Sequence, residues 1–246
     1  MFEQAVILAG GQGTRLRPIT YEISKQLIPV QGKPIMTWLV RWLSRYGVKR
    51  VLIITSVKWH SAYEEWRDAL PKKEPQLTCA VDLWCEPEPM GTLGALVHHL
   101  VPMFDQRPFI LTNGDELKGF SLDRLAEFHL AQCEQHDRYG ATLALREVPN
   151  PSDYGVAEME GDRIIRYHEK PASPPSNLVN SGLYVIEPSA FDVVDHAKKF
   201  LMMEMDLFPQ LAAAGRLGGC VLEGQWFDCG NLARWETAIK EWKEVV

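Results

Sequence analysis

The chain has 246 residues, of which 46% are hydrophobic and 24% are charged. This length and composition allow a substantial buried core and fit one large globular domain or two small ones. The formal net charge at pH 7 is −6, and basic residues form no long block, so the chain lacks the positive surface of a protein that tracks nucleic acid. Nucleic acid is therefore not expected as a partner, and a phosphorylated ligand would be bound by a few local groups.

The start of the chain and its cysteines indicate a cytoplasmic protein. An apolar run at residues 5–8 follows the first four residues, without the basic start and long apolar stretch of a signal peptide. No stretch is suited to a transmembrane span, so we expect no membrane partner. The five cysteines are odd in number and show no short paired spacing, which favours reduced thiols.

The predicted elements of the first half alternate between short β-branched runs and amphipathic segments. The strands are expected at residues 5–8, 51–55, 77–84 and 109–112, and the helices at residues 35–46, 61–70, 93–104 and 122–135. This alternation is typical of βαβ units, which form a parallel sheet with helices on both faces. Ligands of such sheets bind beyond the carboxyl ends of the strands.

After Gly140 the pattern changes to closely spaced strands, which we expect at residues 141–146, 155–158, 164–168 and 178–186. The proline-rich residues 171–175 predict a loop over the ligand edge, because proline cannot donate to a central ladder. Residues 231–245 predict a closing helix. We therefore expect a single domain over residues 1–246, with an α/β, three-layer fold around a mostly parallel, Rossmann-like sheet that has antiparallel additions in its second half.

One group of potential metal ligands follows helical spacing. His129, Cys133 and His136 recur along the predicted helix at residues 122–135 and just beyond it. A structural zinc site normally has a fourth ligand and close ligand pairs, and neither is present in this pattern. A polar helix face is therefore the favoured interpretation.

A glycine-rich turn directly follows the first predicted strand, and its glycines let backbone N–H groups approach a polyphosphate closely. The turn reads Leu8-Ala9-Gly10-Gly11-Gln12-Gly13-Thr14-Arg15-Leu16. The dinucleotide fingerprint would need glycine or alanine at Leu16, and the kinase-type phosphate loop would end in Gly-Lys-Ser/Thr, where this chain has Thr14-Arg15. The residue identities exclude both of these common motifs, and a nicotinamide oxidoreductase is disfavoured with them.

The remaining pattern is a glycine loop with a built-in arginine, followed by a lysine ahead of a Leu-x-Pro-Val run. The second segment reads Ser24-Lys25-Gln26-Leu27-Ile28-Pro29-Val30. This pattern resembles the sugar-1-phosphate nucleotidyltransferases, also called NDP-sugar pyrophosphorylases. The chain is similar to their short single-domain members, which include mannose- and heptose-1-phosphate guanylyltransferases and glucose-1-phosphate thymidylyltransferases.

Further segments that resemble landmarks of this family follow in the family's order along nearly the whole chain. They are the nucleobase loop at residues 86–95, Asn113-Gly114-Asp115, Tyr154-Gly155-Val156, Glu169-Lys170-Pro171, Asn180-Ser181-Gly182-Leu183-Tyr184, the Glu-x-Asp-x-Phe-Pro segment at residues 204–209, and Trp226-Phe227-Asp228-Cys229-Gly230. Each segment alone is compatible with turn, cap or surface residues. The ordered set favours the family.

The resemblance implies an enzyme that joins a nucleoside triphosphate (NTP) to a sugar 1-phosphate and releases pyrophosphate, assisted by Mg²⁺. The nucleotide would be bound by Leu8, Ala9, Gly10, Gly11, Gly13, Thr14, Arg15, Lys25, Glu86, Gly91 and Thr92. The sugar phosphate would be bound by Gly155, Glu169, Lys170 and Asn180, and the metal by Asp115 and Asp228. The catalytic residues would be Arg15, Lys25, Asp115, Lys170 and Asp228. Residues 1–139 would mainly bind the nucleotide and residues 140–246 mainly the sugar phosphate.

The choice of base and sugar stays open at this point. Glu86 can only accept hydrogen bonds, which suits the two adjacent donors of guanine and favours GTP. The resemblance of residues 204–209 to a segment of mannose-1-phosphate guanylyltransferases supports GTP and implies a mannose- or heptose-type sugar. A thymidylyl-, uridylyl- or cytidylyltransferase that acts on glucose 1-phosphate or an amino-sugar 1-phosphate is the alternative. A non-catalytic relative that binds a nucleotide sugar and regulates a partner is disfavoured, because both metal carboxylates and the loop arginine are present. A homo-oligomer is left open.

Overall fold

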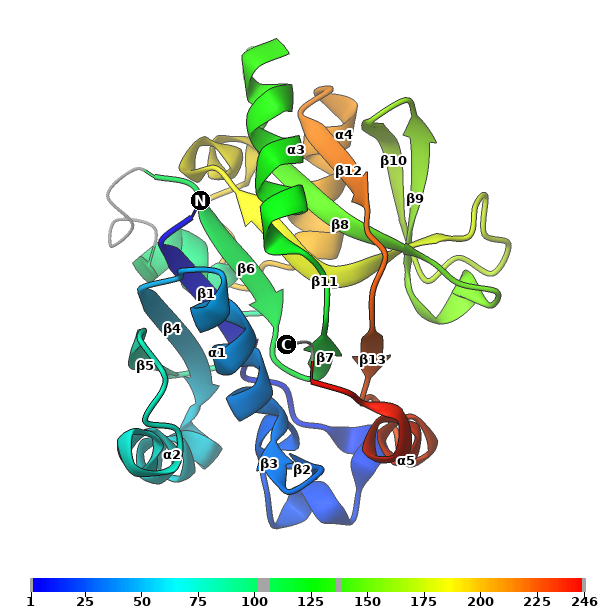
Figure 1. The fold of residues 1–246 in the computed structure, drawn as a ribbon. Helices are drawn as coiled ribbons and strands as arrows, with labels where there is room; N and C mark the ends of the chain where they lie inside the picture. Colours follow the sequence, from blue (N-terminus) through cyan, green and yellow to red (C-terminus); the bar gives the residue numbers. More distant parts are fainter. Residues whose placement is uncertain (1, 101–106, 136–138, 245–246) are drawn as a thin grey trace. The chain divides into compact units, whose positions relative to one another are not determined.

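The structure is a computed structural model that describes residues 2–100, 107–135 and 139–244. The chain forms two compact units that are interleaved along the sequence. The first unit comprises Met1–Pro89, Thr112–Phe120 and Gly224–Val246, and the second comprises Met90–Leu111 and Ser121–Glu223. Both units combine strands and helices (Figure 1), which confirms the predicted α/β class.

The first unit is built on three parallel strands. Strand β4 (Arg50–Ser56) pairs in parallel with β1 (Gln4–Ala9) and with β5 (Ala80–Glu86). Helix α1 (Ile35–Arg45) lies between β1 and β4 in the sequence, and α2 (His60–Lys73) lies between β4 and β5. The alternation of strand and helix therefore produces the parallel pairing expected from the sequence.

Helix α1 forms where apolar residues recur at a helical period. Ile35, Leu39 and Leu43, spaced by four residues, are all at most 1% exposed, so one stripe of the helix enters the core. The indole of Trp42 is also buried and donates a 3.0 Å hydrogen bond to the Phe120 carbonyl. This bond fixes α1 against the segment that follows the first proposed metal carboxylate.

Short elements complete the first unit. Strands β2 (Pro29–Val30) and β3 (Lys33–Pro34) form one antiparallel pair, and β7 (Glu116–Lys118) and β13 (Trp226–Asp228) form another. Helix α5 (Leu232–Glu241) follows β13, within the range where a closing helix was predicted. Single helical turns cover Thr14–Leu16, Ile19–Tyr21, Lys25–Leu27 and Val57–Trp59.

Strand β6 (Phe109–Asn113) belongs to both units, since Leu111 ends a segment of the second and Thr112 begins a segment of the first. The strand order in the second unit is β6-β11-β8-β12-β10-β9. The other bounds are β8 (Ala141–Glu147), β9 (Gly155–Glu160), β10 (Arg163–Glu169), β11 (Leu178–Ile186) and β12 (Leu217–Val221). Strands β8 and β12 are parallel, whereas β11 with β8, β10 with β12 and β10 with β9 are antiparallel. These are the antiparallel additions predicted after Gly140.

The second unit has a helix on each face of its sheet (Figure 1). On β8, Thr142 contacts His129 of α3 (Leu122–Gln135). Tyr184 of β11 lies opposite Leu143, the next residue on β8, and its ring packs 5.2 Å from that of Phe208 in α4 (Phe208–Ala213). Adjacent strand residues point to opposite faces, so α3 and α4 cover opposite faces and this unit has three layers.

The remaining turns of the second unit are helical and short. They cover Leu96–Leu100, Pro151–Asp153, Pro188–Val193 and Met203–Leu207. The first of these falls within the helix predicted at residues 93–104, of which residues 101–104 lie outside the described residues. In the described part of the chain, every helix is too short or too polar to cross a lipid bilayer.

Candidate active site

The glycine loop leaves β1 at its carboxyl end and closes in a helical turn. Gly13 has a left-handed backbone with φ of 62°, and its carbonyl accepts a 2.8 Å hydrogen bond from the Thr20 hydroxyl. A side chain on Gly13 would come within 2.8 Å of Thr20 Cγ2, whereas one on Gly11 would meet no atom within 4 Å. The loop is thus tied down at Gly13 and open at Gly11, where backbone groups can meet a ligand.

Glu86 lies at the end of β5 against this loop. The residue is only 9% exposed, and its Oε2 atom lies 3.1 Å from the position that a Cβ atom on Gly10 would occupy. The absence of a side chain on Gly10 therefore makes space for the Glu86 carboxylate. A residue predicted to contact the base and a residue predicted to contact the phosphates are immediate neighbours.

Lys25 and Asp115 form an ion pair at the same end of β1. The Lys25 ammonium is buried and donates to Asp115 Oδ2. Asp115 is brought there by Gly114, whose N–H donates a 3.0 Å hydrogen bond to the Leu8 carbonyl. A Cβ atom on Gly114 would lie 2.7 Å from that oxygen, so the Asn-Gly-Asp segment needs glycine for this close approach of the two backbones.

Asp228 reaches the same region from near the other end of the chain. It pairs with Glu116 in the β7–β13 ladder, and the next residue, Cys229, donates its N–H to the Asp115 carbonyl at 3.2 Å. Arg234 Nη1 donates to Asp228 Oδ2 at 2.5 Å. The position of Arg234 is set by Asn231, which caps α5 and accepts the Arg234 N–H at 3.0 Å.

Arg15 lies beside Asp228. A Cβ atom on Gly230 would come within 2.6 Å of Asp228 Oδ1 and within 3.3 Å of Arg15 Nη2. The glycine of the Trp-Phe-Asp-Cys-Gly segment is therefore required by the two charged side chains that flank it. The first unit brings together the glycine loop, Lys25, Glu86 and both predicted metal carboxylates, with Arg15 among them.

A buried charged cluster lies next to these carboxylates and was missed by the sequence reasoning. Glu116 Oε2 accepts hydrogen bonds from the Trp226 indole at 2.7 Å and from the Lys118 ammonium at 3.0 Å. Lys118 is almost fully buried. The sequence carried little signal for this cluster, because Glu116 and Lys118 flank only one apolar residue, Leu117, in a strand of three residues.

The charges of this region set two pKa values in opposite directions. Burial raises the pKa of the Glu116 carboxyl and the charges of Asp115 and Asp228 raise it further, against the opposing effect of Lys118. Burial would also raise the pKa of the Asp115 carboxyl, but the Lys25 and Lys118 ammonium groups outweigh it and hold that pKa below its ordinary value. Asp115 is therefore ionised at neutral pH, as a metal ligand must be.

In the second unit, the predicted sugar-phosphate residues meet where β9 and β10 pair. Gly155 lies opposite Glu169, and a Cβ atom on Gly155 would collide with the Tyr167 hydroxyl at 1.8 Å. Lys170 has a left-handed backbone, with φ of 44°, and its ammonium donates to Glu169 Oε1 at 2.6 Å. The Lys170 side chain is 61% exposed, so its charge is available to an anionic ligand.

Asn180 is fixed by three hydrogen bonds in the same group. Its amide nitrogen donates to the hydroxyls of Tyr167 at 3.1 Å and Tyr184 at 3.0 Å, and its Oδ1 atom accepts the Gly182 N–H at 2.9 Å. Both amide donors are thus used within the protein. The remaining lone pair of Oδ1 can accept one hydrogen bond from a ligand hydroxyl.

Gly91 and Thr92, predicted to bind the nucleotide, also lie in the second unit. Gly91 has φ of 81°, and a Cβ atom on it would lie 2.1 Å from the Leu201 carbonyl oxygen. The Thr92 hydroxyl donates to Glu204 Oε2 at 2.9 Å and accepts the Met203 N–H at 2.9 Å. In this structure the Thr92 hydroxyl therefore binds the segment that carries Glu204.

Glu204 is a candidate site residue that was not assigned a role from the sequence. Burial raises the pKa of its carboxyl, the Glu169 charge adds to this rise and Lys170 opposes it, which places Glu204 near both charges. The available signal was its place at the head of the Glu-x-Asp-x-Phe-Pro segment. The second unit thus holds Thr92, Gly155, Glu169, Lys170 and Asn180 with a further acid, and their binding roles stay predictions.

A glycine loop after the first strand of an α/β fold, with basic side chains and paired carboxylates beside it, defines a class of proteins that bind phosphorylated ligands. Residues 4–244 match the family described as nucleotidyl transferase, and the chain belongs to this family. The family resemblance found in the sequence is therefore confirmed. Enzymes of this family generally use a divalent metal ion.

Curated relatives of this chain are enzymes that act on mannose 1-phosphate by name. The mannose-1-phosphate guanylyltransferase catalytic subunit beta of Danio rerio is 36% identical over 93% of this chain and 61% of its own length. The mannose-1-phosphate guanyltransferase of Yarrowia lipolytica is 34% identical over the same shares. The chain thus spans about 61% of the length of these relatives.

Solved structures share the fold. A UDP-glucose pyrophosphorylase complexed with UDP-glucose superposes with a TM-score of 0.77 at 24% identity, covering 98% of both chains. The UDP-glucose pyrophosphorylase of Acinetobacter baumanii gives a TM-score of 0.76 at 20% identity, covering 97% of this chain and 92% of that one. At this level of identity the likeness establishes the fold alone.

Proposed function

We propose that this protein is a sugar-1-phosphate nucleotidyltransferase that converts GTP and a mannose- or heptose-type sugar 1-phosphate to a GDP-sugar and pyrophosphate. The observation that carries the proposal is the meeting of Lys25, Asp115 and Asp228 beside the glycine loop. The names of the mannose-1-phosphate guanylyltransferase relatives support the choice of base and sugar.

The residues suit a reaction that needs positioning and charge neutralisation more than acid–base chemistry. A phosphate monoester has a second pKa of about 6, so a sugar 1-phosphate is mostly a dianion at neutral pH and already a nucleophile. The difficulty is to bring this anion in line with the α-phosphorus of another polyanion. Arg15, Lys25 and Lys170 supply positive charge for this purpose, and the predicted site contains no histidine.

Asp115 and Asp228 fit a divalent cation bound by oxygen. Each pairs through its Oδ2 atom with a cation, Lys25 or Arg234, and a carboxylate has further lone pairs on both oxygens for another ligand. Mg²⁺ takes one or two carboxylates together with waters and phosphate oxygens. When bound there, Mg²⁺ would neutralise charge on the phosphates during transfer.

The other residues divide between the two substrates. In the first unit, the backbone of the glycine loop would bind the triphosphate, Arg15 the departing pyrophosphate and Lys25 the α-phosphate. In the second unit, the Lys170 ammonium would bind the sugar phosphate, and Glu169 and Asn180 would accept hydrogen bonds from sugar hydroxyls. Gly155 would contribute its backbone there.

The purified protein is expected to release pyrophosphate only when an NTP, a sugar 1-phosphate and Mg²⁺ are all present. EDTA should abolish the release, because the sugar phosphate and triphosphate would then meet without charge neutralisation. A matrix of GTP, UTP, dTTP and CTP against mannose, heptose, glucose and amino-sugar 1-phosphates measures both activity and preference. Tight binding of nucleotide sugar without turnover on any pair would establish the regulatory alternative.

Glu86→Gln is expected to reduce the preference for GTP over UTP, measured as the ratio of kcat/KM values, by about 10-fold or more. A bidentate hydrogen-bonded contact to a base contributes about 1–3 kcal/mol of discrimination, and an amide presents one acceptor where the carboxylate presents two. Glu88→Gln is the matched control, because Glu88 is exposed in the same segment. A wild type that prefers UTP or dTTP, or a variant with unchanged selectivity, would contradict the assignment of Glu86.

A further inference from the structure

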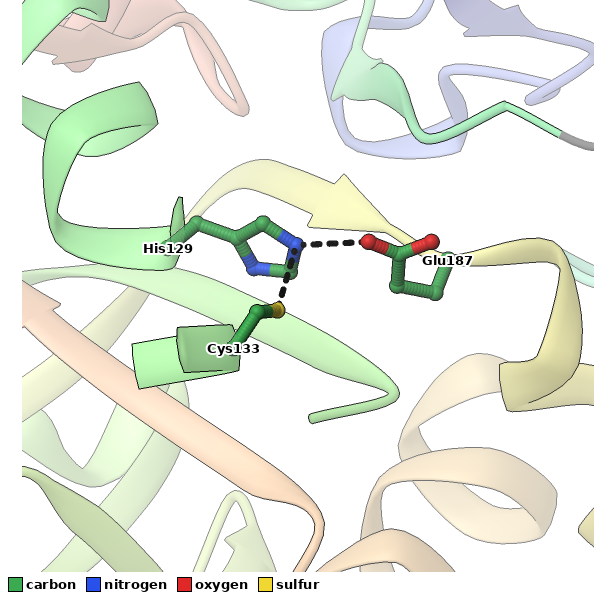
Figure 2. Close-up of side chains that lie close together, drawn as sticks. All are labelled: His129, Cys133 and Glu187. Atoms are coloured by element: carbon green, nitrogen blue, oxygen red, sulfur yellow. Dashed lines mark hydrogen bonds and ion pairs between the residues drawn. The ribbon is translucent and has the colours of Figure 1, made fainter. Parts of the chain in front are cut away.

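A second cluster of potential metal ligands lies in the second unit, between helix α3 and the end of β11 (Figure 2). His129 and Cys133 are four residues apart on α3 and therefore share one face of the helix. Glu187, the first residue after β11, completes the cluster. The sequence pattern offered His136 as the third member, and this residue lies outside the described residues.

Two of the three spacings between the ligand atoms match those around a tetrahedral ion. His129 Nε2 lies 3.1 Å from Glu187 Oε1 and 3.5 Å from Cys133 Sγ. All three ligand atoms lie within 4.8 Å of one another. With zinc bonds of about 2.0 Å to nitrogen and oxygen and about 2.3 Å to sulfur, the ligands of a tetrahedral site are separated by about 3.3 to 3.6 Å. The two spacings from His129 Nε2 already lie close to these values.

The imidazole is held in the orientation that a metal ligand needs. His129 is fully buried, and its Nδ1 atom lies 2.8 Å from the Thr142 hydroxyl, which is also fully buried. Metal-binding histidines generally use their second nitrogen in such a hydrogen bond, which fixes the ring and its tautomer. A carboxylate only accepts, so the contact with Glu187 places the ring proton on Nε2 in the metal-free chain. Once a metal takes Nε2, the Thr142 hydroxyl can accept from Nδ1–H.

The combination of sulfur, nitrogen and oxygen ligands indicates which metal would bind. Thiolate and imidazole ligands suit zinc, whereas Mg²⁺ requires oxygen ligands. Glu187 is 25% exposed and Cys133 is half-buried, so water can supply a fourth ligand. Cysteine binds a metal ion as the thiolate, so a bound metal would displace a proton from sulfur.

We propose that His129, Cys133 and Glu187 bind Zn²⁺ through Nε2, Sγ and a carboxylate oxygen, with water as the fourth ligand. On binding, the Cys133 thiol releases its proton to solvent, and the metal replaces the Nε2 proton of His129, which stays neutral by taking up a proton at Nδ1. The ion would connect α3 to the end of β11 and is separate in chemistry from the magnesium ligands proposed above. The sequence pattern could not include Glu187, because this residue lies 58 positions from His129.

Cobalt titration of the full chain, freed of metal with EDTA, tests the proposal. With Mg²⁺ in excess to occupy the carboxylate site, Co²⁺ should give a thiolate-to-metal charge-transfer band that saturates at one equivalent, and Zn²⁺ should remove the band. Cys133→Ser should lose the band and weaken Zn²⁺ binding by about 100-fold or more, beyond the usual effect of losing an outer-sphere partner. Cys79→Ser, a change at another partly buried cysteine, should keep both. No band in the wild type, or a band that persists in Cys133→Ser, would overturn the proposal.

Two further variants test whether the ion binds at this cluster and through His129. Thr142→Val keeps the shape of the buried residue but removes the hydroxyl, so Zn²⁺ binding should weaken by about 10-fold with the band retained. Asp228→Asn should leave cobalt binding unchanged, whatever happens to nucleotidyl transfer. Unchanged affinity in Thr142→Val, or loss of the band in Asp228→Asn, would show that His129 is not the ligand or that the ion binds elsewhere.

Discussion

Asp228→Asn is expected to lower kcat by about a thousandfold or more at saturating substrates. A metal ion supplies several kcal/mol of transition-state stabilisation, and each 1.36 kcal/mol corresponds to a factor of ten in rate. Asparagine keeps the shape of the side chain but removes the charge that would hold the metal. The free energy of unfolding should fall by about 3 kcal/mol or less, because Arg234, the ion-pair partner of Asp228, is 27% exposed and stays partly solvated.

Steady-state pyrophosphate release and thermal denaturation of the same preparations measure the two effects of Asp228→Asn. Asp68→Asn is the matched control, because Asp68 is 68% exposed and paired with Arg67 in the same unit. Arg234→Gln separates the two roles of Asp228, since it removes the ion pair but keeps the carboxylate. If Arg234→Gln were as inactive as Asp228→Asn, or if Asp228→Asn kept near-normal kcat, Asp228 would not be the metal ligand.

Features encoded by local spacing could be predicted from the sequence. The glycine loop and the parallel strands around β4 follow from patterns within a few tens of residues. The bond between Trp226 and Glu116 joins residues 110 positions apart, and that between Thr92 and Glu204 joins residues 112 apart. Such contacts depend on which strands and loops are adjacent in the folded chain. The periodicity of the sequence does not predict this adjacency.

The division of the chain shows the same limit. Residues 1–139 were expected to bind mainly the nucleotide, and this division of labour stays a prediction. In the structure, Gly224–Val246 joins the first unit, so Asp228 lies in the same unit as the glycine loop. The motif at Asp228 identified the residue, while its partners Glu116 and Arg15 emerge only from the β7–β13 pairing and from the contact at Gly230.

The ion pair between Lys25 and Asp115 stabilises the fold, which the sequence motifs did not indicate. The Lys25 side chain is 7% exposed and that of Asp115 is 28% exposed. Removing one partner of such a pair leaves the other charge poorly solvated, which typically costs about 3–5 kcal/mol. A substitution at Asp115 alone will therefore lower stability as well as activity. An experiment must distinguish loss of the metal ligand from loss of the folded protein.

A double-mutant cycle on Lys25 and Asp115 separates them. Lys25→Met and Asp115→Asn should each lower the free energy of unfolding by about 3 kcal/mol, the lower end of the range because Asp115 is partly exposed. The double variant leaves no unpaired charge and should come within about 1 kcal/mol of wild type, while its kcat stays at least about a thousandfold lower. The exposed pair of Lys49 and Glu3 is the control, where Lys49→Met and Glu3→Gln should each cost less than about 1 kcal/mol.

The pH dependence of stability checks the same pair independently. The folded pKa of Asp115 lies below its ordinary value, so its ionised form stabilises the fold above the unfolded pKa of about 3.9, and this contribution is lost as the pH falls through the folded pKa. The free energy of unfolding of wild type, measured with denaturant, should therefore fall more steeply below about pH 4 than that of the double variant, which has no carboxyl at residue 115. Parallel curves would mean that the pair does not stabilise the fold. A double variant that recovers activity along with stability would mean that Asp115 has no part in binding the metal.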